Sequence, residues 1–86
     1  MTPIADLSAS FVRVLGSDFR TQGAGFVVTR EGLITTCAHV VQNAGKGPGD
    51  PIRVTFQATG EETEAEVETL GWSDRDAQDV AFLRLK

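Results

Sequence analysis

The feature that most constrains the fold is an apolar hairpin in the first half of the chain. Residues 26–29 and 33–36 consist of apolar and β-branched residues, and only Arg30, Glu31 and Gly32 separate them. Glycine accepts the positive φ that a tight hairpin loop requires, so this pattern predicts two antiparallel strands joined by a short turn. The hairpin therefore favours a β-sheet protein.

Four further segments predict strands. Apolar residues alternate with polar ones at residues 52–57, and again in a segment that runs from residue 64 towards Trp72. Residues 11–15 and 79–85 add a first and a last apolar strand. Closing six short antiparallel strands into a small barrel buries their apolar side chains and removes exposed sheet edges. We therefore expect an all-β fold with a single six-stranded antiparallel barrel.

Glycine, proline and short polar runs mark the connections between these strands. Gly23 and Gly25 are interpreted as permissive positions at a strand start, because a phosphate-binding loop would need a helix directly after it. Residues 38–41 predict a single helical turn, and residues 43–51 predict an exposed loop. Residues 1–7 are expected to form a loose lead-in.

The size and charge of the chain limit its partners. The 86 residues make one domain, residues 1–86, and a domain of this size hides only about 60% of the surface of its unfolded chain. The net charge of −4 argues against nucleic acid or an anionic membrane as a partner. Acidic residues gather at residues 61–68, where the alternation indicates the solvated face of a strand in preference to a site for a basic partner.

Cys37 is the only cysteine, so no internal disulfide can form, which fits a reducing compartment. Its position at a strand end predicts a buried structural thiol in preference to a cysteine nucleophile. One histidine and one cysteine are too few for a zinc site, and no cofactor is expected. Since neither a signal sequence nor a membrane-spanning segment is visible, we expect a soluble, cytoplasmic protein.

His39 and Asp79 are the candidates for chemistry. An imidazole can take a proton from a nucleophilic hydroxyl near neutral pH, and a carboxylate on its other nitrogen fixes the tautomer and stabilises the positive charge. Asp74 and Asp76 are competing acids, although their loop setting is typical of surface residues. The residues alone leave open an ordinary surface or hydrogen-bonded His39 and an Asp79 that serves as a turn or cap.

Two motifs in the chain resemble those of trypsin-like serine proteases. The first stands as GAGFVV, GLITT and CAHVV within residues 23–41, and the second as DVAFLRL at residues 79–85. The resemblance covers most of the chain and implies a Greek-key barrel, the N-terminal half of a trypsin-like double barrel. It also implies that His39 is the general base, that Asp79 orients it, and that a polypeptide is the substrate. Val40 stands where the digestive enzymes carry a disulfide-forming cysteine, so the resemblance is to bacterial, HtrA-type members.

The nucleophile of that family has no counterpart in this chain. The family's serine lies in a Gly-Asp-Ser-Gly-Gly-like turn of a second barrel, which also forms the oxyanion hole. Ser8, Ser10, Ser17 and Ser73 lack such flanking glycines. Because both the nucleophile and the oxyanion hole are missing, we expect the chain to be inert as a peptidase on its own.

Three interpretations remain open. The chain is the N-terminal half of a serine endopeptidase, which its end just after DVAFLRL favours, or a non-catalytic half-barrel that acts as a protein-binding or self-assembly module. The third is a β-barrel adaptor whose resemblance is coincidental. In the first two, the missing C-terminal barrel or a second copy is expected to cover the open face, since an exposed apolar face favours association.

Overall fold

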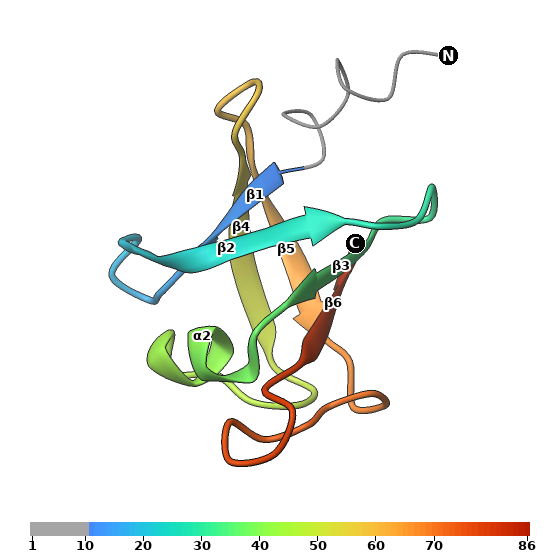
Figure 1. Cartoon of the computed structure of the whole chain (residues 1–86). Helices are drawn as coiled ribbons and strands as arrows, with labels where there is room; N and C mark the ends of the chain where they lie inside the picture. Colours follow the sequence, from blue (N-terminus) through green and yellow to red (C-terminus); the bar gives the residue numbers. More distant parts are fainter. Residues whose placement is uncertain (1–10) are drawn as a thin grey trace.

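A computed structural model describes residues 11–86, which form a closed barrel of antiparallel strands (Figure 1). The expected lead-in at residues 1–7, together with Ser8 and Ser10, lies outside the described residues. The strands are β1 (Phe11–Leu15), β2 (Thr21–Val27), β3 (Leu33–Thr36), β4 (Pro51–Phe56), β5 (Glu62–Val67) and β6 (Ala81–Leu85). One short helix, α2 (Ala38–Asn43), lies between β3 and β4 in this part of the chain. The all-β, six-stranded fold is confirmed.

The order of the strands around the barrel is β1-β2-β3-β6-β5-β4, and β4 pairs with β1 to close it. The first three strands follow one another, and β4 then returns to lie beside β1. This arrangement is a Greek key. The return connection carries α2 and the loop at residues 44–50 past one end of the barrel (Figure 1). The strand β6 is inserted between β3 and β5 and pairs with both of them.

Alternating side chains fill the interior of the barrel, although β2 contributes only the half-buried Val27. On β4, for example, Ile52 and Val54 are buried, whereas Arg53 between them is exposed. The same period of two is expected of any strand with one wet face. The largest fully buried side chains are Ile34, Leu83, Val12, Val14, Val41, Val54 and Val67.

The predicted hairpin is confirmed in its second strand and corrected in its first. Gly32 has a φ of 92° in the turn, as expected. The strand before it spans Thr21–Val27, not residues 26–29. It begins early because Gly23 and Gly25 pair with β1 in the middle of the strand. A Cβ on Gly23 would lie 2.5 Å from Val40 Cγ2, so this glycine lets α2 pack directly on the strand.

Two predicted strands are longer in the sequence pattern than in the structure. The strand β5 ends at Val67 and does not run on to Trp72, because the chain turns at Gly71, where φ is 84°. In that turn Leu70 is 85% exposed, while Trp72 packs against the rim of the core. The last strand, β6, begins at Ala81, which leaves the predicted first residue of that strand in the preceding loop.

The acidic run at residues 61–68 lies on the outer surface, as predicted. Ion pairs with basic side chains of neighbouring strands and of the chain end neutralise part of it. They are Glu62–Arg53, Glu64–Lys86 and Glu68–Arg84, at 3.2, 3.2 and 2.9 Å. Pairs as exposed as these contribute little to stability, so their effect is to remove like-charge repulsion along β5.

Candidate active site

The helix α2 presents His39 at one end of the barrel. Its neighbours Ala38, Val40 and Val41 are buried and anchor the helix against the core. His39 lies on the remaining face, with 39% of its side chain exposed. Cys37, just before the helix, keeps an extended conformation with φ −94° and ψ 144°. The helix therefore begins directly after Cys37 and carries the imidazole on its more exposed face.

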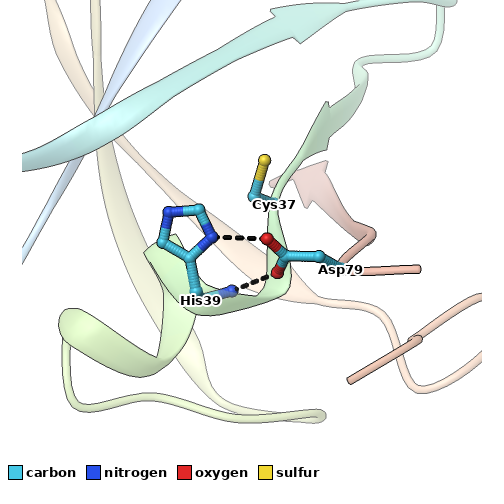
Figure 2. A group of neighbouring side chains, drawn as sticks. All are labelled: Cys37, His39 and Asp79. Carbon is cyan, nitrogen blue, oxygen red and sulfur yellow. Dashed lines mark hydrogen bonds and ion pairs between the residues drawn. The ribbon is translucent and has the colours of Figure 1, made fainter. Parts of the chain in front are cut away.

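Asp79 meets His39 across 40 positions of sequence (Figure 2). Its Oδ2 lies 2.5 Å from His39 Nδ1, and its Oδ1 accepts the backbone N–H of His39 at 2.7 Å. Both carboxylate oxygens are thus engaged by one residue. A carboxylate accepts hydrogen bonds and has no proton to donate, so the neutral imidazole carries its proton on Nδ1.

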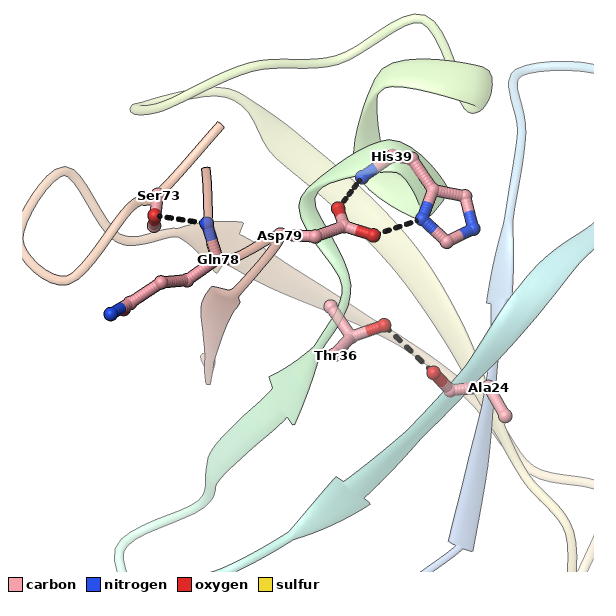
Figure 3. A network of polar contacts seen from close by, with 6 residues as sticks. All are labelled: Ala24, Thr36, His39, Ser73, Gln78 and Asp79. Atoms are coloured by element: carbon pink, nitrogen blue, oxygen red, sulfur yellow. Dashed lines mark hydrogen bonds and ion pairs between the residues drawn. The ribbon is translucent and has the colours of Figure 1, made fainter. Parts of the chain in front are cut away.

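The loop before β6 fixes the position of Asp79. Its φ is 58°, in the left-handed region, which aspartate tolerates better than most residues. The backbone N–H of Asp79 donates to the carbonyl of Asp74 at 3.0 Å, and Ser73 pairs with Val80 as an isolated bridge. The hydroxyl of Ser73 accepts the N–H of Gln78 at 3.1 Å (Figure 3). The loop is thus closed on itself and aims the carboxylate at α2.

The hydrogen bonds of His39 lower the pKa of Asp79 from its ordinary value of 3.8. The side-chain hydrogen bond is the largest cause, the backbone N–H of His39 is the next, and the positive charge of Arg75 adds a smaller contribution. Partial burial opposes these effects without reversing them. Asp79 is therefore an anion at neutral pH.

The second ring nitrogen, Nε2, points away from Asp79 (Figure 2). With the proton on Nδ1, Nε2 has a free lone pair and is the basic atom of the pair. Beside the site, the Thr36 hydroxyl donates to the carbonyl of Ala24 at 2.7 Å and ties β3 to β2 (Figure 3). The arrangement can take a proton from a group that approaches His39 from outside the barrel.

The other predicted candidates lie elsewhere or differ from expectation. Asp74 and Asp76 are exposed, as predicted, and Asp74 accepts a hydrogen bond from Trp72 Nε1 at 2.9 Å. Cys37 is exposed, so the prediction of a buried structural thiol is wrong. The strand β3 ends one residue earlier, at Thr36, whose side chain takes the inward position. The sequence places the Cys37 thiol near His39, but its pattern does not show that the thiol also lies beside Asp79.

The fold and this histidine–aspartate pair define a barrel of the chymotrypsin type. Residues 23–86 match the family of trypsin-like peptidase domains, and the chain belongs to that family. Its fold is similar to that of the serine endoprotease from Yersinia pestis, with a TM-score of 0.69 and 25% sequence identity. The match covers 96% of this chain but only 28% of that one. No curated protein matches the chain significantly.

The resemblance to bacterial serine proteases is thereby confirmed for the described part of the chain. Within residues 11–86, no helix is long and apolar enough to cross a membrane.

Proposed function

We propose that this barrel provides the general base and its orienting carboxylate for peptide-bond hydrolysis by a serine endopeptidase. His39 is the base and Asp79 orients it. The observation that carries the proposal is the double contact of Asp79 with one residue, through Nδ1 and through the backbone N–H of His39. A carboxylate held in this way fixes both the tautomer and the direction in which Nε2 points.

The chemistry follows from the proton on Nδ1. Nε2 takes the proton of a serine hydroxyl as that oxygen attacks the peptide carbonyl, and the positive charge that forms on the ring is stabilised by Asp79. Nε2 then gives the proton to the leaving amine. A water molecule repeats the cycle to release the acyl group, with His39 again acting first as base and then as acid.

The serine must come from outside the described residues. Ser73 accepts a hydrogen bond within its own loop, and Ser17 lies in the exposed turn between β1 and β2. Neither is at the site, and inertness of the chain on its own stays part of the proposal. A second barrel, or a second copy of this chain, would cover the exposed side of His39, and a polypeptide would bind between them. A cytoplasmic location likewise stays an expectation, as does the absence of nucleic-acid and membrane partners.

The first test is the coding sequence after Lys86. A further region of roughly 100 residues, the ordinary size of a domain, that contains a Gly-Asp-Ser-Gly-Gly-like turn would supply the nucleophile. In that complete protein, His39→Ala should lower kcat for a peptide substrate by about 10⁶-fold, because no group remains to take the serine proton. Asp79→Asn should lower kcat by about 10⁴-fold, since an amide can donate to Nδ1 and favour the wrong tautomer.

Asp74→Asn is the matched control, because it removes a carboxylate five residues away that faces solvent. It should leave kcat within about twofold, as expected for a surface substitution. Full activity of His39→Ala would reject the catalytic role and favour a barrel that acts as a protein-binding or assembly module.

A further inference from the structure

The thiol of Cys37 lies beside the histidine and aspartate that form the candidate active site (Figure 2). One donor atom from each of Cys37, His39 and Asp79 lies within 4.8 Å of the other two. A thiolate, an imidazole and a carboxylate are three of the groups that bind zinc in proteins. One histidine and one cysteine alone are too few, but the fold adds Asp79 as a third donor.

We propose that Cys37, His39 and Asp79 form a binding site for Zn²⁺ or a similar thiophilic divalent cation, with His39 Nδ1 as the nitrogen ligand. Around a tetrahedral zinc ion, sulfur, nitrogen and oxygen donors lie roughly 3.4–3.6 Å apart. The 2.5 Å between Nδ1 and Asp79 Oδ2 must therefore widen, and wider gaps within the 4.8 Å cluster must close. Small side-chain rotations can do both, because Cys37 is exposed and the other two side chains are 39% and 28% exposed.

Three protein ligands leave the fourth tetrahedral position open to water. The charges are also suitable, since a thiolate and a carboxylate neutralise the two positive charges of the ion. Arg75 opposes binding, because it lies close enough to lower the pKa of Asp79 through its charge. These features predict a cation site of moderate affinity, not a structural zinc centre.

Binding of the metal releases one proton from the site. Cys37 loses its thiol proton to solvent when sulfur binds the metal, and Asp79 is already an anion. His39 stays neutral, but its proton moves from Nδ1 to Nε2 when Nδ1 takes the cation. In the proposed function Nε2 is the atom that accepts the serine proton, so the bound metal blocks the base directly. This consequence rests on the proposed function, whereas the metal site itself does not.

Titration of this chain with Co²⁺ tests the site. The wild-type chain should bind one equivalent and show the near-ultraviolet absorption that a cobalt–thiolate bond produces, and added Zn²⁺ should displace the cobalt. Cys37→Ser should lose that absorption and bind Zn²⁺ at least about tenfold more weakly. His39→Gln should also weaken Zn²⁺ binding about tenfold or more, while it keeps the thiol.

Asp74→Asn is the matched control and should bind both metals as the wild type does. Absence of the cobalt absorption in a folded wild-type chain would overturn the proposal. So would equal Zn²⁺ affinity of the wild type and Cys37→Ser. An equal loss in Asp74→Asn would also overturn it, since the metal would then be held by general surface acidity.

These outcomes are separable from those of the proposed function, because binding is measured without any proteolysis. In the complete peptidase, Zn²⁺ should inhibit the wild type, a chelator should restore activity, and Cys37→Ser should need at least about tenfold more Zn²⁺ for half inhibition. The two proposals can also fail separately. If this chain binds the metal but the complete protein with His39→Ala is still an active peptidase, the role of His39 as general base is rejected and the metal site is supported.

Discussion

At the scale of single residues, Asp79 has to meet two structural requirements at once. It combines a left-handed backbone conformation with hydrogen bonds to both the ring and the backbone of His39. The sequence indicated the residue but placed it at the head of a strand. It could not show that β6 begins two residues later, because a left-handed turn at an aspartate leaves no distinctive pattern.

The lowered pKa of Asp79 predicts a pH dependence of stability. The folded chain holds the proton of this carboxyl less tightly than the unfolded chain, so ionised Asp79 stabilises the fold above its ordinary pKa of 3.8. That contribution is lost as the pH falls through the lowered pKa of the folded state. Urea denaturation of the wild type and Asp79→Asn should give stabilities that differ most well above pH 3.8 and that converge as the pH falls below 3.8.

Asparagine suits this comparison because it tolerates the same left-handed conformation. In His39→Ala the side-chain hydrogen bond is lost while the backbone N–H remains, so its pH dependence should be intermediate. If the stabilities of the wild type and Asp79→Asn changed in parallel with pH, the stabilising role of ionised Asp79 would be contradicted.

At the scale of elements, β2 explains why the sequence pattern was incomplete. Two of its glycines allow neighbouring elements to approach closely because they carry no side chain. Gly23 lies against Val40 of α2, and Gly25 lies against Ile34 of β3. A pattern of apolar alternation detects side chains that fill a core, and it cannot detect positions where a side chain must be absent. The strand β3, which alternates normally, was predicted to within one residue of its observed end at Thr36.

Gly25→Ala should destabilise the barrel by about 1–3 kcal/mol, through overpacking. The new Cβ would lie 2.9 Å from Ile34 Cγ2 and 3.0 Å from the carbonyl oxygen of Thr35, and a backbone carbonyl cannot move aside easily. Chemical denaturation measures the loss. Gly47→Ala is the control: its Cβ would lie 4.0 Å from the carboxylate of Asp50, so stability should change by less than about 1 kcal/mol. Equal stabilities of the two variants would refute the packing explanation.

At the scale of the whole molecule, the closed barrel was predictable from strand count and alternation, whereas the meeting of His39 with Asp79 was predictable only from the family resemblance. Those two residues are 40 positions apart, and their contact depends on β6 entering between β3 and β5. Leu83 stands opposite Ile34 on one side and Val67 on the other, and it is fully buried. The closure of the barrel therefore depends on this side chain.

Leu83→Ala should lower the free energy of unfolding by about 2–5 kcal/mol, because it removes buried methyl groups and leaves a cavity. Leu70→Ala makes the same chemical change at a position that is 85% exposed, and should change stability by less than about 0.5 kcal/mol. Thermal or urea denaturation of the two variants beside the wild type measures the contrast. Similar losses in both would mean that β6 does not seal the core as described.

The insertion of β6 between its two neighbours also ties the histidine–aspartate contact to the integrity of the barrel. Asp79 lies just before β6, so the carboxylate reaches His39 only while β6 is paired with β3 and β5. Local opening of β6 therefore separates the two residues even where α2 stays folded.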